Sequence, residues 1–399
     1  MNVFKLCVAT VFCFTMASCS NEDLDYVSVP DQLPKTKSVE NVIELSTVAQ
    51  LVASMEMDQA VMDEIKEGVD RSLSYGLDEE FRFIDMLQPT SSKLFRNTNS
   101  LSFVEKLKNL LNSSSLTKGA EVNSLEIFDY LSQNDIQIYW PYSKKWDGKM
   151  RPVITYLQEG DKNYRLGYVQ NGDSQIDTIS LNKDFVKNNP VWIINKNNTP
   201  YDELPDFENG EFVNEDGVFF YSKKANEWLS KKQSRIGLGS PVYIGEITVS
   251  ERDGLIGGSE LYFMWGHAGG GMGLPIQGML NTYRMNIPNN ELDLVKKIDL
   301  NIQPGWTTYE KTNALIILEK DGGKNKSTTR NLIYTNPSGM VDVTVPVSFK
   351  YEKRDEWLYD GIFERKNIFS SANKGSDGKY KQYHGSGIYF TLTTPEFTE

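Results

Sequence analysis

The sequence predicts an α+β protein of several domains: a small N-terminal helical module, then antiparallel β regions, and a β-sandwich at the C-terminus. Three observations predict this order. Apolar residues recur every three or four positions in residues 46–134, as they do on one face of a helix. After Asp135, short runs rich in Val, Ile, Tyr and Trp alternate with clusters of turn residues. The 399 residues also exceed what a single hydrophobic core usually serves.

The start of the chain has the pattern of an export signal. Lys5 is followed by the apolar run Leu6–Met16 and then by two small residues directly before Cys19. The apolar run is about eleven residues long, whereas a membrane-crossing helix needs roughly twenty. We therefore predict a signal peptide at residues 1–19, lipidation of Cys19 and no transmembrane helix.

Residues 20–45 are polar, contain Pro30 and Pro34, show no periodicity, and are predicted to form a flexible tether. The acidic stretch Ser20–Asp25, directly behind the cysteine, resembles the surface-export signal of Bacteroidetes lipoproteins. This resemblance, limited to the signal and that stretch, implies an outer-membrane lipoprotein that faces the cell surface or the periplasm. Two or three acyl chains on Cys19 would anchor it stably, because a single chain binds a membrane only marginally.

Residues 46–134 are predicted to form four or five short helices that pack together. In the clearest of them Asp58 is the N-cap, apolar side chains repeat from Val61 to Leu73, and Gly76 follows the end. Further helix starts are expected at Thr47 with Gln50, at Asp78, at Ser102 with Glu105, and at Ser124.

Residues 135–232 are predicted to form a β-rich module of antiparallel strands. Gly, Asn, Asp and Pro separate its strand-like runs, as turn residues do. One short helix is expected at Ala225–Lys232, around Trp228. The runs are Ile136–Trp140, Val153–Gln158, Tyr164–Gln170, Ile176–Leu181 and Val191–Ile194.

Residues 233–399 are predicted to form the C-terminal β-sandwich, because many short strands without intervening helices are typical of that architecture. Val341–Glu352 alternates strictly between apolar and polar residues, and Pro346 within it indicates an edge strand or a bulge. Gly322 and Gly323 are expected to form the turn of a hairpin. Other strands are predicted at Val242–Val249, Glu260–Met264, Lys297–Ile302, Ala314–Leu318 and Gly387–Thr393.

Composition excludes several classes of function. A net charge of −12 would repel nucleic acid, so we expect no such partner. Cys7, Cys13 and Cys19 are the only cysteines, which leaves the exported part without a disulfide framework or a Cys-based zinc site. The only two histidines, His267 and His384, are too far apart in the chain for the HExxH zinc motif and too few for a three-histidine metal site, and no P-loop is present.

No cofactor is expected, although acidic pairs in predicted loops would allow a calcium site. These loops carry Glu251 with Asp253, Glu319 with Asp321, and Asp355 with Glu356 and Asp360. None of them has the spacing of a known calcium-binding loop, so we assign no metal ligand.

Two places carry candidate ligand-binding residues. Trp140 and Trp146 belong to an aromatic group between the helical and β parts, and an exposed indole face can stack on a sugar ring. Trp265 and His267 begin a glycine-rich stretch that would let a ligand approach the backbone closely. The alternatives are interdomain packing for the tryptophans and a mobile connection between strands for the glycines.

These observations favour a lipid-anchored extracytoplasmic binding or interaction protein, with the membrane and an extracellular glycan or protein as partners, over an enzyme. The alternative is an extracellular hydrolase that acts on glycans or peptides through carboxylates. A binding module predicts exposed, coplanar aromatic rings on one β face. A hydrolase predicts a deep cleft with two close carboxylates, at least one of which has a shifted pKa.

Overall fold

The computed structural model describes residues 43–96, 101–113, 124–157, 166–171, 175–233, 239–250, 258–271 and 274–395. The predicted signal peptide, Cys19 and most of the predicted tether lie outside these residues. The α-helices are α1 (Leu45–Ala53), α2 (Gln59–Ser74), α3 (Phe83–Leu87), α4 (Ser102–Ser113), α6 (Ser124–Gln133), α7 (Lys183–Asn188), α8 (Lys223–Gln233) and α9 (Arg365–Ile368). Short 3-10 turns include η2 (Ser143–Lys145) and η5 (Asn289–Glu291).

The strands of the first half are β1 (Glu80–Arg82), β2 (Ile136–Tyr139), β3 (Val153–Tyr156), β4 (Leu166–Gln170), β5 (Ile176–Ser180), β6 (Val191–Lys196) and β7 (Val218–Phe220). Those of the second half are β8 (Ser240–Val249), β9 (Ser259–Gly271), β10 (Leu274–Ile287), β11 (Lys296–Trp306), β12 (Thr312–Glu319), β13 (Asn325–Asn336), β14 (Val341–Glu352), β15 (Glu356–Glu364), β16 (Gln382–His384) and β17 (Ile388–Thr393). Helices first and mostly antiparallel sheets afterwards confirm the predicted α+β class.

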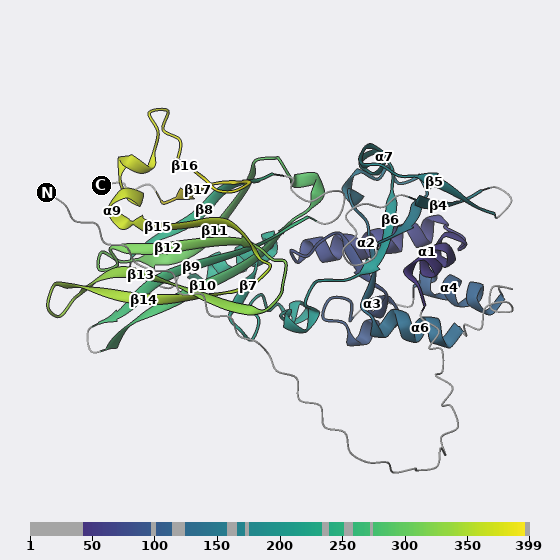
Figure 1. Cartoon of the computed structure of the whole chain (residues 1–399), viewed down its shortest axis with the longest axis horizontal. Helices are drawn as coiled ribbons and strands as arrows, with labels where there is room; N and C mark the ends of the chain where they lie inside the picture. Colours follow the sequence, from purple (N-terminus) through teal and green to yellow (C-terminus); the bar gives the residue numbers. More distant parts are fainter. Residues whose placement is uncertain are drawn as a thin grey trace, which may run out of the picture. The chain divides into compact units, whose positions relative to one another are not determined.

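The first sheet has the strand order β1-β2-β6-β3-β4-β5, and α1, α2, α3 and α6 contact its strands (Figure 1). β1 comes from the segment predicted to be helical, yet it pairs with β2 from the segment predicted to be β-rich. The boundary expected at residue 134 therefore falls inside one sheet. β3 pairs with β6 in parallel, so this region is mixed rather than wholly antiparallel.

The C-terminal part is a β-sandwich, as predicted. One sheet has the order β15-β12-β9-β10-β7 and the other β11-β8-β17-β16, and their inner faces share one buried apolar cluster. The two-stranded sheet β13-β14 covers the outer face of the first, through Leu332 and Phe349 packed against Met264 and Ile316. β7 joins this sandwich in parallel with β10, although its residues were predicted to belong to the preceding module.

The caps of the helices were predicted correctly only in part. Asp58 caps α2, because its carboxylate accepts from Val61 N at 3.1 Å. Thr47 does not start a helix, since α1 already begins at Leu45. Ser102 is the first helical residue of α4 rather than its cap, and its N–H donates to the Glu64 carboxylate of α2 at 2.9 Å. A distant carboxylate thus supplies the acceptor that the local sequence was expected to provide.

Two predictions about glycines were wrong. The stretch from Gly266 to Gly271 is not a loop, because β9 continues through it and pairs with β10. Gly322 and Gly323 form a turn with φ of 74° and 117°, but the strands they connect are not a hairpin. β12 pairs with β9 and β15, whereas β13 pairs with β14, so this turn carries the chain from one sheet to another. β14 is an edge strand, as Pro346 indicated.

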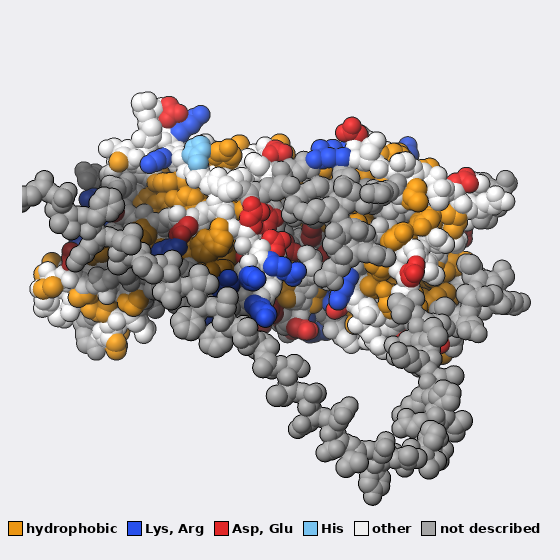
Figure 2. Space-filling view, in the orientation of Figure 1, with side chains coloured by type: hydrophobic (Ala, Val, Ile, Leu, Met, Phe, Trp, Pro, Cys, Tyr) orange, Lys and Arg blue, Asp and Glu red, His pale blue; other side chains and the backbone are white. Residues whose placement is uncertain are grey.

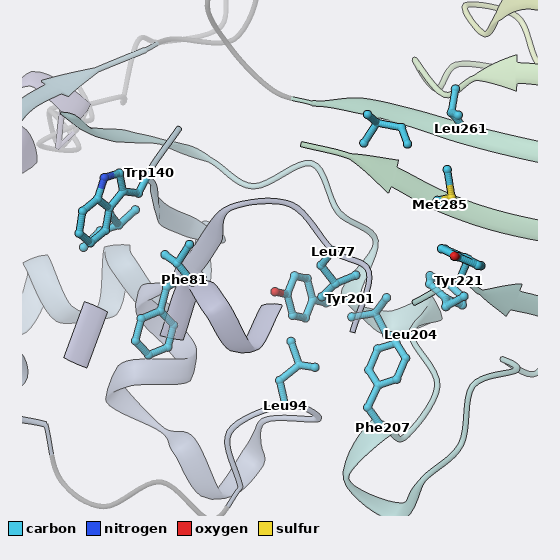
Figure 3. Packing of buried hydrophobic residues seen from close by; sticks show 14 of the residues in the cluster. Leu77, Phe81, Leu94, Trp140, Tyr201, Leu204, Phe207, Tyr221, Leu261 and Met285 are labelled. Atoms are coloured by element: carbon cyan, nitrogen blue, oxygen red, sulfur yellow. The ribbon is translucent and has the colours of Figure 1, made fainter. Parts of the chain in front are cut away.

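One large apolar cluster underlies both the first sheet and the sandwich. Figure 3 shows part of it, with Phe81 and Trp140 from the first sheet region and Leu261 and Met285 from the sandwich strands β9 and β10. Leu77 belongs to the same cluster and is 1% exposed. It directly precedes three acidic residues, which places carboxyl groups beside an apolar interior.

Candidate functional site

A shallow depression opens where the turn after β2 meets the end of α7. It holds about 220 Å³ not filled by protein atoms, including space open to solvent. Its lining comes from two segments about 40 residues apart in the chain: Trp140, Tyr142, Lys145, Trp146 and Met150 from the turn, and Val186, Lys187, Asn188, Asn189 and Pro190 from α7 and the residues after it. Trp140 and Trp146, both predicted as candidates, therefore lie at one site.

The two tryptophans have different roles in this depression. Trp140 is fully buried and packs edge-on against Trp146, with ring centroids 5.4 Å apart and planes at 62°, and against Trp192 at 5.6 Å. Trp146 is half-buried, and its Nε1 donates to the carbonyl oxygen of Met150 at 2.9 Å. The expectation of exposed, coplanar rings is wrong for this pair. Trp140 supports the site from behind, and Trp146 alone can offer a ring face.

The polar groups of the depression are amides and ammonium groups. Lys145 and Lys187 line it, and none of its ten lining residues is acidic. The Asn188 and Asn189 amide nitrogens donate to backbone oxygens of α7 at 2.7 and 2.8 Å, which holds both side chains in place. Two of the ten lining side chains are thus cationic, and the nearest acidic residues in the chain, Asp147 and Asp184, lie outside the lining.

A buried carboxylate, Glu79, holds the turn that carries Trp146. Its oxygens accept from Tyr142 N at 3.0 Å and from Ser143 N and Oγ, each at 2.9 Å. Tyr142 has a left-handed φ of 60°, which is uncommon for an aromatic residue and must be stabilised by its surroundings. Burial and, after it, the charge of Asp78 raise the pKa of Glu79 to about 7.

Glu79 is the middle member of three consecutive buried acids, and their exposed fractions are 9% for Asp78, 0% for Glu79 and 1% for Glu80. Burial raises the pKa of Asp78 to about 6 and that of Glu80 to about 8. Glu260 of β9 adds to both shifts, and it is paired with Arg284 at 2.8 Å.

The outer two acids are bound by different parts of the chain. Asp78 accepts from its neighbour Glu79 N at 2.8 Å and from Gly258 N, just before β9, at 3.0 Å. Glu80 accepts from Asn197 Nδ2 at 2.8 Å, from Thr199 Oγ1 at 3.1 Å and from the Tyr201 hydroxyl at 3.2 Å. Nothing in the sequence predicted this trio, because three adjacent acids are normally a solvated turn.

The hydrolase alternative required two carboxylates of this kind in a cleft. The structure does contain carboxyl groups with raised pKa values, but these three are enclosed by the fold and hydrogen-bonded to it. They do not line the depression. Glu79 supports the turn of the depression from inside, whereas Asp78 and Glu80 hold other segments of the chain.

Trp265 and His267, the other predicted pair, lie on β9 in the sandwich and not in the depression. Trp265 is fully buried between Trp306 and Phe363, with ring centroids 5.6 and 6.0 Å away. The His267 side chain is 12% exposed, and its Nδ1 is 3.6 Å from Glu310 Oε2. The four sequence-predicted residues thus form two separate groups, and the second is part of a core.

The glycines near Trp265 serve packing. A Cβ at Gly266 would lie 2.4 Å from the Phe349 ring, and one at Gly278 would lie 2.5 Å from the Pro346 carbonyl oxygen. These two positions are where β14 crosses β9 and β10. Because these two positions lack a side chain, the two-stranded sheet β13-β14 can approach. Packing therefore accounts for glycine at both positions, and no ligand is needed to explain it.

The acidic loops considered for calcium are engaged in internal bonds where the structure describes them. The Asp355 carboxylate accepts from Asp321 N at 3.1 Å, from Gly322 N at 3.2 Å and from Lys320 Nζ at 2.9 Å. Glu251 and Asp253 lie outside the described residues. Within the described ranges, no three His, Cys, Asp or Glu side chains are grouped so that they could hold a metal ion.

Comparison with known proteins adds no family. No protein-family model matches the chain, and no curated protein matches it either. In the described part of the chain, no helix has both the length and the apolar character needed to cross a membrane.

Proposed function

We propose that this protein is a lipid-anchored, extracytoplasmic binding protein that takes a carbohydrate at the depression around Trp146. One observation carries the proposal: a half-buried indole, supported from behind by a buried one, lies beside two lysines and two asparagines with no acidic residue among the lining side chains. A sugar ring has a C–H face that can stack on the indole of Trp146. Its hydroxyls can form hydrogen bonds with the asparagine amides of the lining.

The two lysines favour an acidic carbohydrate over a neutral one. An ammonium group attracts a uronate or sulfate group strongly when no carboxylate competes for it nearby. Anchoring through Cys19 outside the cytoplasm, which the signal pattern supports, would place the site where such carbohydrates occur.

The direct test is binding of the chain from Ser20, which keeps every residue that the structure describes, to a panel of soluble polysaccharides. The panel pairs polygalacturonate, alginate and chondroitin sulfate with neutral xylan, mannan and dextran. We expect saturable binding to an acidic member, weakened by salt because part of the attraction is between exposed charges.

The Trp146→Ala variant should bind at least about tenfold more weakly, in line with a lost stacking contact of one to a few kcal/mol. Trp146→Phe keeps a ring and should retain most of the affinity. Trp357→Ala removes a half-buried indole from the sandwich instead and should bind as the unmodified chain does. Binding that is unchanged in Trp146→Ala, or no binding to any polysaccharide of the panel, would rule the proposed site out.

A further inference from the structure

Two β-hairpins of the sandwich end side by side. The Tyr334 hydroxyl of β13 donates to the Gly270 carbonyl oxygen of β9 at 2.6 Å, close to the end of each hairpin. A small apolar cluster, separate from the main core, lies between them, and it consists of Ala268, Tyr334 and Val345 with Ile276 and Val343 packed against it. The ends of the β9–β10 and β13–β14 hairpins are thus held together as one unit, and both lie at the left of Figure 1.

Three residues near the ends of these hairpins are large, apolar and exposed. Leu274 at the start of β10 is 71% exposed, Met340 in the β13–β14 turn is 72% exposed, and Val341 is 62% exposed. We call these three side chains the apolar tip. Figure 2 shows hydrophobic side chains gathered over the end of the β13–β14 hairpin, at the lower left of the view.

The backbone conformation at Met340 is energetically unfavourable for a methionine. Its φ of 51° is left-handed, a conformation for which glycine or asparagine is the usual residue in a turn. A methionine there is strained, and its side chain gains nothing from burial within the chain. Strain combined with apolar exposure indicates that the side chain is used outside the fold.

The ends of the two hairpins carry little charge. No Asp, Glu, Lys or Arg occurs between Glu260 and Arg284, or between Arg330 and Asp342, in a chain of which 24% is charged. Protein interfaces usually carry charged or hydrogen-bonding groups at their rims, which fix orientation. The three side chains of the apolar tip are uncharged and make no strong hydrogen bonds, which matches a medium that is itself apolar and has no fixed shape.

We propose that the apolar tip inserts into the acyl region of a lipid bilayer. The side chains protrude from turns rather than line a groove, so they can enter a fluid phase without a complementary surface. Since the hairpin ends carry no cation and the chain is acidic, the fitting surface is zwitterionic rather than anionic.

The proposed anchor sets how far the molecule can be from a bilayer. The 23 residues from Ser20 to Val42 separate the proposed lipid at Cys19 from the described part, and an extended chain of that length spans about 80 Å. They join the described part next to α1, at the end of Figure 1 opposite the hairpin ends. This reach rests on the proposed anchor, whereas insertion itself needs none. The two can therefore fail independently.

The experiment uses the chain from Ser20, without lipid, and vesicles of pure phosphatidylcholine or of phosphatidylcholine with one fifth phosphatidylglycerol. We expect the chain to co-sediment with the first vesicles at least as well as with the second. A variant with Leu274→Ser, Met340→Asn and Val341→Thr should lose at least tenfold in vesicle affinity. Its matched control changes three exposed apolar side chains elsewhere, Leu125→Ser, Leu294→Ser and Val295→Thr, and should bind like the unmodified chain.

A second readout reports insertion directly. All three cysteines precede Ser20, so Val341→Cys introduces the only thiol, which can carry an environment-sensitive fluorophore. Its emission should shift to the blue with phosphatidylcholine vesicles, and the same label at Leu294→Cys should not shift. Failure of both co-sedimentation and the shift would overturn the proposal. So would a change of oligomeric state in the triple variant without any vesicle binding, which would assign the tip to a second copy of the chain. Trp146→Ala should bind vesicles normally, which separates this result from carbohydrate binding.

Discussion

At the scale of single residues, burial is the largest cause that raises the pKa values of the three acids, to about 6 for Asp78, about 7 for Glu79 and about 8 for Glu80. The donors around them differ in kind. Both donors to Asp78 are backbone N–H groups, which can only donate and so favour the carboxylate. Glu80 is bound by the Asn197 amide and by the hydroxyls of Thr199 and Tyr201, and a hydroxyl can accept a hydrogen bond from a neutral carboxyl as well as donate to a charged one.

This difference in donors predicts opposite results for two amide substitutions. Glu80→Gln keeps an acceptor for Asn197 and offers its N–H to a hydroxyl, so unfolding by urea at pH 8 should show unchanged or increased stability. Asp78→Asn leaves an N–H facing a backbone N–H, and it should lower the free energy of unfolding by about 1–3 kcal/mol. Equal losses in the two variants would contradict the role given to the donors.

At the scale of elements, β9 shows how glycine residues can make a strand hard to recognise in a sequence. Its first half, Ser259–Trp265, has bulky apolar residues, and its strand character could be predicted from them. From Gly266 onward, glycine takes positions where an added Cβ would meet β14, at Gly266, or the neighbouring strand β10, at Gly269 and Gly270, so the alternating pattern disappears from the sequence. Only the tertiary packing reveals why the chain needs small residues there, and local sequence cannot supply that.

A pair of glycine-to-alanine variants tests this explanation. Gly266→Ala places a Cβ 2.4 Å from the Phe349 ring and should cost about 1–3 kcal/mol of stability through overpacking. Gly339 lies in the β13–β14 turn, where the nearest atom to an added Cβ is 3.8 Å away, so Gly339→Ala should be nearly neutral. Thermal unfolding compares them, and a tolerated Gly266→Ala would show that β14 does not press on β9.

The depression also could be predicted only in part, because some of its residues come together through contacts between distant segments. Trp140 and Trp146 could be selected from the sequence because they stand six residues apart, near a change of period. Their partners from α7 could not, since they reach the site only through the parallel pairing of β3 with β6, which follows α7. The support from Glu79 was equally hidden, because β1 is three residues long and begins with an acid.

At the scale of the whole molecule, the fold class could be predicted because it depends on periodicity, which is local. The pairing of sheets depends on contacts between distant segments, and there the expected boundaries differ from the structure. β1 and β7 illustrate this, since each pairs with strands assigned in advance to a different module.

The buried acids give the whole fold a dependence on pH. In the unfolded chain these carboxyls titrate near their ordinary values of 3.8 and 4.5, whereas in the folded chain their pKa values are about 6 to 8. Between these limits the folded chain binds more protons, so the free energy of unfolding should fall as pH rises from about 5 to 8. Urea unfolding at several pH values measures this, and a flat or rising profile would contradict it. Glu80→Gln should flatten the upper part of the profile.

Anchoring is also tested on the whole molecule. We expect the full chain to fractionate with membranes and to incorporate a labelled fatty acid, because the residues before Cys19 match a lipoprotein signal. Cys19→Ala should abolish the label and release most of the protein into the soluble fraction. Cys13→Ala, within the apolar run, serves as the control and should keep the label.

The hydrogen bonds between Glu79 and the turn of Trp146 couple carbohydrate binding to the protonation of Glu79. Tyr142 N and Ser143 N can only donate, so an ordered turn favours the ionised form of Glu79, whose pKa lies at about 7. A carbohydrate that rigidifies this turn would lower that pKa and expel part of a proton into solution. Calorimetry in phosphate and in Tris at pH 7 would then give different heats for the same binding event, because each buffer absorbs the released proton with its own enthalpy.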